Sequence, residues 1–266
     1  MRRLLIIVAL VFAHTAWSGD FEDGLAAIRR NDYATALTKF LSAAQQGIAG
    51  AQHNLGVMFD NGLGVELDYK KAMGFYLLAA DQGVAAARHN LGVMYDRGNG
   101  VGQDYREAVK WWRMAAEQGY ADSQFNLAVA YAKGEGVAQN YKEAVRWYRL
   151  AAQQEHAKSQ LNLGLAYHKG QGVIQDYKEA LRWYQMALKH GGVEASIFLG
   201  IIYATGEGVK QDLLRAHMWF NIAAMSGDSI NSEVRDNIAS KMSPQQVEQA
   251  QRMARECVNS NFTKCF

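Results

Sequence analysis

Residues 86–111 read AARHNLGVMYDRGNGVGQDYREAVKW, and this stretch decides the fold of the chain. Its apolar side chains recur at steps of three and four residues on both sides of a glycine-rich segment, as two short amphipathic helices require. Gly98 can adopt the left-handed conformation that ends the first helix, and Asp104 can cap the second. Glu107 would then complete a capping box with Asp104. The stretch therefore predicts a helical hairpin. We expect the same box at Asn140 with Glu143 and at Asp176 with Glu179.

The hairpin repeats with a constant period of 36 residues, the separation of Tyr69 from Tyr105. One column of the repeat holds Tyr33, Tyr69, Tyr105, Tyr141, Tyr177 and Leu213. Small residues fill two further columns and should allow helices to approach closely: Gly56, Gly92, Ala128, Gly164 and Gly200 in one, Ala79, Ala115, Ala151, Ala187 and Ala223 in the other. A fixed period over six copies is typical of a solenoid, in which each unit is one supersecondary element.

The pattern at Ala86 to Trp111 returns with changes from Asp122 to Trp147 and from Lys158 to Trp183. It resembles the Sel1-like repeat, a long-loop relative of the tetratricopeptide repeat. The resemblance implies an all-α fold, a right-handed α-solenoid of stacked helical hairpins.

The repeats predict the domain organisation. We expect a signal peptide at 1–18, a tetratricopeptide-like capping hairpin at 19–49, five repeats of 36 residues at 50–227, capping helices at 228–257 and a tail at 258–266. Within the last part, Ser243 should cap a helix whose first residue is Pro244.

The N-terminus has the pattern of an export signal. Arg2 and Arg3 precede an apolar run from Leu4 to Ala13, which is too short to span a bilayer, and small residues lie at Ala16 and Ser18. We therefore expect cleavage near Ser18 and a periplasmic or secreted product. No second run of 18 apolar residues exists in the sequence, so no transmembrane segment is expected after signal removal.

The overall charge argues against a nucleic-acid partner. The chain of 266 residues has 28 basic and 26 acidic residues, and the two surplus cations, Arg2 and Arg3, lie in the expected signal. A nucleic-acid binding protein usually carries a basic patch, which a neutral body does not indicate.

The motifs of common enzymes are missing. The five Gly-x-Gly pairs lack the third glycine of a dinucleotide fingerprint, and no strand is expected before them. No serine is followed three residues later by lysine, and no Gly-x-Ser-x-Gly or His-Glu-x-x-His occurs. We predict that the chain is not an enzyme and holds neither cofactor nor metal.

One column of asparagines is a candidate peptide-binding surface: Asn54, Asn90, Asn126 and Asn162. The resemblance to tetratricopeptide proteins implies that the first helix of each hairpin lines the concave face, where His53, His89, Phe125, Val93 and Val129 would lie beside the asparagines. An amide both donates and accepts hydrogen bonds, which suits a peptide bond. About three residues of an extended ligand would match each repeat, because packed helices lie about 8–10 Å apart. The amides could instead tie neighbouring hairpins together, and both interpretations stay open.

Two further sets of residues have structural interpretations. The tryptophans Trp111, Trp147, Trp183 and Trp219 share the second helix with packing positions, so we expect them in the core between hairpins rather than in a binding stripe. Cys257 and Cys265 are the only cysteines, and we predict that they form a disulfide in an oxidising compartment.

These observations favour a non-catalytic scaffold or regulator in the bacterial envelope that binds a protein or peptide. A cell-wall-acting hydrolase, β-lactamase-like by the same family resemblance, and a structural component of an envelope assembly are the alternatives.

Overall fold

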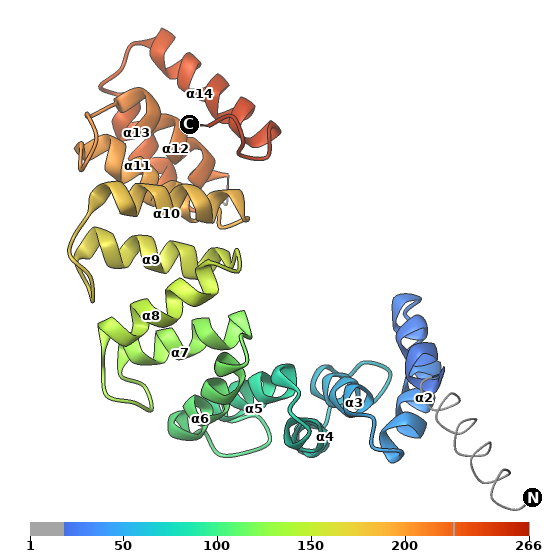
Figure 1. The fold of residues 1–266 in the computed structure, drawn as a ribbon. Helices are drawn as coiled ribbons and strands as arrows, with labels where there is room; N and C mark the ends of the chain where they lie inside the picture. The colour runs from blue at the N-terminus through green and yellow to red at the C-terminus, as the bar shows by residue number, and fades with distance from the viewer. Residues whose placement is uncertain (1–18, 226, 266) are drawn as a thin grey trace, which may run out of the picture. The chain divides into compact units, whose positions relative to one another are not determined.

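The computed structural model of the chain describes residues 19–225 and 227–265. In these residues every regular element is a helix, beginning with a helical segment at residues 19–29 (Figure 1). The helices that follow are α2 (Tyr33–Gln45), α3 (Ala49–Asn61), α4 (Tyr69–Asp81), α5 (Ala85–Arg97), α6 (Tyr105–Glu117), α7 (Ala121–Lys133), α8 (Tyr141–Ala152), α9 (Ala157–Lys169), α10 (Tyr177–Lys189), α11 (Ala195–Thr205), α12 (Leu213–Ala224), α13 (Ser229–Ala239) and α14 (Pro244–Asn259). The expected signal peptide, residues 1–18, lies outside the described residues.

Each repeat forms one helical hairpin, whose first helix we call helix A and whose second we call helix B. Helices α3, α5, α7, α9 and α11 are helix A, and α4, α6, α8, α10 and α12 are helix B. Within each unit, successive hairpins pack on one another: α4 contacts both α3 and α5, and α10 contacts both α9 and α11. The predicted all-α solenoid of stacked hairpins is confirmed.

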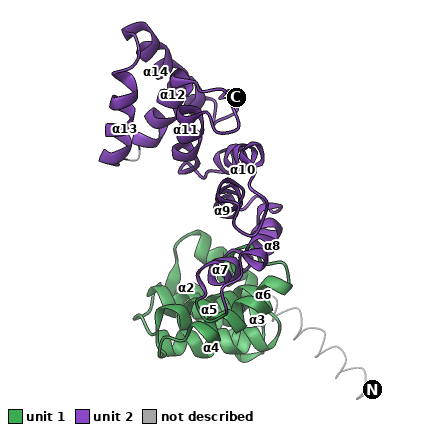
Figure 2. Cartoon of the chain, turned by 90° about the vertical axis from the view of Figure 1, so that its left-hand side faces the viewer, with its two compact units in different colours: residues 1–123, 135–137 green, residues 124–134, 138–266 purple. Residues whose placement is uncertain are grey.

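The chain divides into two compact units (Figure 2). The first unit comprises residues 1–123 and 135–137, and the second comprises residues 124–134 and 138–266. In the first unit, Lys39 on α2 pairs with Asp20 at 2.7 Å and Asp23 at 3.0 Å, which joins the first helical segment to α2. In the second unit, α13 and α14 both pack on α12, at the end of the last repeat.

Local sequence signals explain where the helices begin and end. Gly98 ends α5 with a φ of 75°, and its N–H donates to the carbonyl of Met94. Each helix B begins after a residue whose side chain accepts backbone N–H bonds: Asp68, Asp104, Asn140, Asp176 and Asp212. The predicted left-handed glycine and the predicted N-caps are therefore confirmed.

The predicted capping box is only half formed in three of these helices. The expected bond from the glutamate side chain back to the backbone N–H of the N-cap residue is absent, so this part of the prediction is wrong. The carboxylates of Glu107, Glu143 and Glu179 pair with Lys110, Arg146 and Arg182, one turn later on the same helix. A cation three residues away attracts the carboxylate, so it does not reach back to the N-cap backbone. Among the described helices, α14 has both halves of the box, formed by Ser243 and Gln246.

Small residues bring helix A against helix B. A Cβ atom on Gly92 would lie 2.4 Å from the indole of Trp112, and one on Gly164 would lie 2.6 Å from the ring of Tyr184. The alanine column of helix B is buried: Ala79, Ala115, Ala151, Ala187 and Ala223. Both expectations of close approach are confirmed.

The tryptophan column lies in or beside the core, as predicted. Trp147 and Trp219 are buried, and Trp111 packs half-buried against the core around Tyr76. Trp183 is also half-buried. The column is thus mainly a packing feature.

The glycine-rich loop connects each hairpin to the one before it. A Cβ atom on Gly136 would lie 2.2 Å from the carbonyl oxygen of Tyr105, and one on Gly172 would lie at the same distance from that of Tyr141. The second glycine of each pair therefore allows the loop to press on the first residue of the preceding helix B. This packing explains the Gly-x-Gly pairs without a phosphate ligand.

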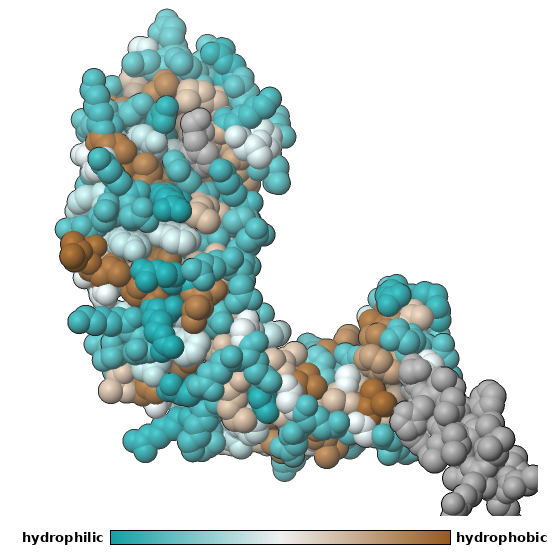
Figure 3. All heavy atoms as spheres, viewed as in Figure 1, coloured by the Kyte–Doolittle hydropathy of each residue, from teal (hydrophilic) through white to brown (hydrophobic). Residues whose placement is uncertain are grey.

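The described surface is mostly polar. Hydrophilic side chains dominate the face shown in Figure 3, and hydrophobic residues appear there in small groups. The large aliphatic side chains Leu55, Leu91, Leu127, Leu163 and Leu199, one from each helix A, are fully buried. Among residues 19–225 and 227–265, no helix combines the length and apolar character that a membrane crossing needs.

Candidate peptide-binding surface on helix A

The asparagine column occupies one position on each of four successive A helices. Asn54 lies on α3, Asn90 on α5, Asn126 on α7 and Asn162 on α9, and all four side chains are half-buried. Val93 and Val129 lie one turn further along α5 and α7 and are half-buried too. The four asparagines thus occupy equivalent positions on successive A helices, but the contacts that they make differ.

Asn90 belongs to a polar network between two hairpins of the first unit. Its Nδ2 atom lies 3.4 Å from Nε2 of His53 on α3, and its amide also hydrogen-bonds the Tyr76 hydroxyl. The Tyr76 hydroxyl in turn donates to Oδ2 of Asp60 at 3.4 Å. Burial raises the pKa of Tyr76 well above its usual value, so this hydroxyl keeps its proton. Asn90 therefore ties α5 to α3 while part of its side chain stays exposed.

The hollow beside Asn90, which we call the Asn90 hollow, has a volume of about 180 Å³. It is lined by Asp60, Asn61, Tyr69, Asn90, Val93, Met94, Arg97 and Asn99. Two predicted residues, Asn90 and Val93, meet here. Asp60 and Arg97 were missed by the sequence reasoning. Burial raises the pKa of Asp60, while the Tyr76 hydroxyl and the Arg97 charge oppose that rise.

A second hollow lies at the equivalent place two repeats later, in the second unit. This Asn162 hollow has a volume of about 150 Å³. Its lining includes Tyr141, Asn162, Leu165, Ala166 and Lys169, which stand 72 positions after Tyr69, Asn90, Val93, Met94 and Arg97. The amide of Asn162 donates to the carbonyl of Lys158 on its own helix, at 2.8 Å. Unlike Asn90, it makes no described bond to another hairpin.

The predicted neighbours of the asparagines are engaged in packing. Burial lowers the pKa of both His53 and His89, so both favour the neutral ring. The His89 Nδ1 atom lies 2.9 Å from the Ser123 hydroxyl, and its ring centroid lies 5.2 Å from that of Tyr120. These contacts leave less of each ring for a ligand than the sequence pattern suggests.

Phe125, in the second unit, has a comparable environment. Its ring centroid lies 6.0 Å from that of Tyr148 and 5.1 Å from that of His156. Phe125 therefore forms part of an aromatic cluster between α7, α8 and the start of α9, and it remains half-buried.

His156 and His168 also have intramolecular partners. His156 caps α9 by accepting from the N–H of Ser159. His168 lies between the Tyr184 hydroxyl, 3.4 Å from Nδ1, and the Glu207 carboxylate, 3.2 Å from Nε2. In the described part of the chain, no three His, Cys, Asp or Glu side chains are grouped so that they could hold a metal ion.

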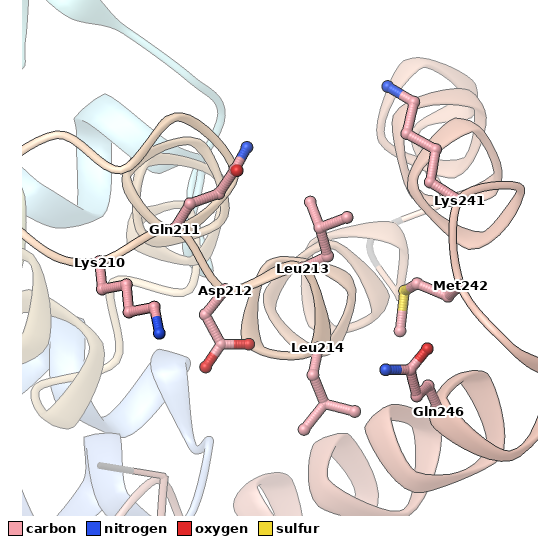
Figure 4. Close-up of a pocket in the computed structure, with 8 residues that line it drawn as sticks. All are labelled: Lys210, Gln211, Asp212, Leu213, Leu214, Lys241, Met242 and Gln246. Carbon is pink, nitrogen blue, oxygen red and sulfur yellow. The ribbon is translucent and has the colours of Figure 1, made fainter.

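A larger hollow of about 470 Å³ lies at the C-terminal end of the repeats. Figure 4 shows Met242 and Gln246 facing Leu213 and Leu214 across it, with Lys210 and Lys241 further out. Leu213 occupies the column that holds tyrosine in the preceding repeats, where the next glycine-rich loop would pack. The capping helices α13 and α14 follow instead of such a loop, so the site is left partly open.

The tail is closed by a disulfide. Cys257 and Cys265 are bonded, with their Cα atoms 4.9 Å apart, and both side chains are buried. The bond holds the end of the chain against the last turns of α14.

The fold and the helix-A surface are those of an α-solenoid built from long-loop hairpins. The Sel1 repeat pattern matches residues 49–84, 85–120, 121–156, 157–192 and 193–228. The chain therefore belongs to the Sel1 repeat family. Proteins of this family typically act as scaffolds for protein interaction and are generally non-catalytic.

Solved structures show the same architecture. A Sel1 repeat protein from Oxalobacter formigenes is 34% identical, with a TM-score of 0.76, over 88% of this chain and 98% of that one. A protective antigen of uropathogenic Escherichia coli strains, described as displaying an SLR fold, is 27% identical with a TM-score of 0.61. That match covers 92% of this chain and 62% of the antigen. No curated protein gives a significant match.

Proposed function

We propose that the chain is a non-catalytic scaffold of the bacterial envelope that binds a peptide segment of a partner protein along helix A. The observation that carries this proposal is the recurrence of one hollow at equivalent positions in both units. Asn90 and Val93 line it in the first unit, and Asn162 and Leu165 line it in the second. Each hollow combines an amide with an apolar side chain, a combination suited to a peptide backbone and its side chains.

The envelope location is supported by two independent features. Residues 1–18 have the composition of a secretory signal, and the Cys257–Cys265 disulfide is of a kind that persists in oxidising compartments. The product would be periplasmic or secreted. The disulfide also links the tail to Cys257, the last residue of the C-terminal cap that we propose at 228–257.

The proposal is tested by capturing partners from an envelope extract with the chain from residue 19 onward and identifying them by mass spectrometry. The affinity of a captured partner is then measured for the Asn90→Ala and Asn162→Ala variants. We expect each variant to bind about two- to twelve-fold more weakly, because each loses one hydrogen-bonding group of about 0.5–1.5 kcal/mol.

The matched control is Asn237→Ala, which removes an exposed amide on α13 that lines neither hollow. It should bind as the unchanged chain does. Undiminished affinity in both hollow variants, with helical content unchanged, would rule out helix A as the binding surface.

A further inference from the structure

The two equivalent hollows differ in charge. In the Asn90 hollow, the positive Arg97 faces the negative Asp60, and the two attract one another electrostatically. In the Asn162 hollow, the corresponding residues are Lys169 and Ala132. The Asn162 hollow thus keeps a cation at the position of Arg97 but has no carboxylate at the position of Asp60. The second hollow therefore has a positive charge that the first one offsets internally.

The charged residues of the A helices around these hollows also differ between the two units. In the first unit, α3 and α5 carry two acids, Asp60 and Asp96, and two bases, Arg88 and Arg97. In the second unit, α9 carries Lys158 and Lys169 without any acid, and α11 carries no Asp, Glu, Lys or Arg. Helix α7 carries one acid, Asp122, and one base, Lys133, so its charges cancel. The charges of α3 and α5 balance as well, whereas α9 is basic.

Four carboxylates on neighbouring elements of the second unit are already engaged. Glu143 and Glu179 pair with arginines on their own helices, and Glu207 lies against His168. Asp176 accepts the N–H groups at the start of α10. Within the described residues, Lys169 is exposed and has no ion-pair partner within 4.0 Å. Its ammonium group is available to an external anion.

The rest of the Asn162 hollow supplies polar and apolar surface next to that cation. The Tyr141 hydroxyl accepts a bond from Nε2 of Gln139 at 3.1 Å, so its own proton remains available to donate. One N–H of the Asn162 amide is used within α9, which leaves the second for another acceptor. Leu165 and Ala166 add an apolar floor. A carboxylate beside a small apolar group complements this set.

We propose that the occupant of the second unit's helix-A surface is an acidic segment of a protein partner, with an Asp or Glu carboxylate seated on Lys169 in the Asn162 hollow. This rests on the proposed function and narrows it to a class of partner. The Asn90 hollow, in which Asp60 offsets Arg97, takes an uncharged part of the same kind of ligand or none. Attraction between exposed charges weakens as salt increases, so binding falls with ionic strength.

The experiment is selection from a displayed library of random 12-residue peptides on the chain from residue 19 onward. Parallel selections use the Lys169→Gln and Ala132→Asp variants, the latter restoring the acid that position 60 carries. The control is Lys142→Gln, which removes an equal charge from an exposed position on α8. Circular dichroism verifies that all variants are folded.

We expect the unchanged chain and Lys142→Gln to enrich Asp and Glu in the selected peptides, and both hollow variants to lose that enrichment. A selected acidic peptide should bind the hollow variants about ten-fold more weakly, the loss of one charge-assisted hydrogen bond. Enriched peptides without an acidic preference, or a preference unchanged in Lys169→Gln, would overturn the acidic-segment inference and leave the scaffold proposal standing.

No enrichment of any peptide would overturn both. A second experiment tests whether anionic lipid, rather than a peptide, occupies the Asn162 hollow. It measures sedimentation of the chain with phosphatidylglycerol vesicles. Binding to the vesicles that disappears in Lys169→Gln would make lipid the occupant and contradict the peptide. Absence of vesicle binding, together with acidic selection, supports the protein partner.

Discussion

The indole of Trp112 on α6 lies directly on the backbone of α5 at Gly92, where an added Cβ atom would come within 2.4 Å of its Cδ1 and Nε1 atoms. The same relationship joins Gly56 to Tyr76, Gly164 to Tyr184 and Gly200 to Phe220. In these four hairpins, one aromatic ring of helix B thus sets how closely helix A can approach. The third hairpin carries the buried Ala128 in the same column, so the close contact with glycine belongs to the other four.

Replacing Gly92 by Ala should destabilise the first unit by about 1–3 kcal/mol, because the new methyl group overpacks a buried, rigid indole. Alanine is a better helix former than glycine by about 1 kcal/mol, which offsets part of the loss. The measurement is the free energy of unfolding from urea titration followed by circular dichroism. Unchanged or increased stability would show that Trp112 can move away at little cost.

The chain supplies its own control for this substitution. Gly74 lies inside α4 and is exposed, and a Cβ atom added to it would meet no atom within 4 Å outside its own helix. Gly74→Ala should therefore raise stability by about 0.5–1 kcal/mol through helix propensity alone. A decrease in the free energy of unfolding for Gly92→Ala and an increase for Gly74→Ala would separate the effect of packing from that of helix propensity.

Much of the fold could be predicted because a periodic sequence repeats its signals. Gly98 ends a helix and Asp104 begins one, and the same pairing of residue types recurs in other repeats. The capping boxes could not be predicted reliably, since Glu107 has a choice between the N-cap backbone and Lys110. Competition between two nearby partners depends on side-chain conformations that a residue pattern does not specify.

Part of the lining of the Asn90 hollow could be predicted. Asn90 and Val93 lie one turn apart on α5 and share the hollow, but Asp60 enters it from the preceding repeat. The column of Asp60 continues as Asp96, Ala132 and His168, so it has no constant residue type that periodicity would single out. The charge of each hollow depends on positions whose residue type varies between repeats. Such positions can be recognised as lining residues only once the structure shows where the hollows lie.

Stability should fall as the pH is lowered from about 7.5 to about 5, across the usual titration range of histidine. Burial lowers the folded-state pKa of His53 and His89, so the unfolded chain binds more protons below its ordinary histidine pKa near 6.5. Their contribution is complete above that pKa and is lost as the pH falls toward the folded-state values. Urea midpoints across this range provide the measurement.

The variant for this test is His53→Gln with His89→Gln, in which neither position titrates. Its midpoint should depend less on pH than that of the unchanged chain. Some dependence should remain, because burial also lowers the pKa of His217. An equal slope in both proteins would show that these two rings are not responsible.

Breaking the disulfide should loosen the C-terminal cap and leave the repeats folded. Cys257→Ser with Cys265→Ser removes a link that closes a short loop, worth about 2–3 kcal/mol in the chain-entropy description. Hydrogen exchange should accelerate in the last turns of α14 and the tail. Alkylation of the secreted protein without reductant gives a second measurement, in which two free thiols would contradict the bond.

The two asparagines of the hollows should respond differently to truncation. Asn90→Ala removes an amide that joins α5 to His53 and Tyr76, so we expect a loss of about 1 kcal/mol in the free energy of unfolding. Asn162→Ala removes a bond within one helix, at a partly exposed position, and should change stability by less than about 0.5 kcal/mol. Affinity for a captured partner should fall in both variants. A stable Asn162→Ala protein with reduced affinity would separate ligand binding from hairpin packing, whereas full affinity would leave the column a structural role alone.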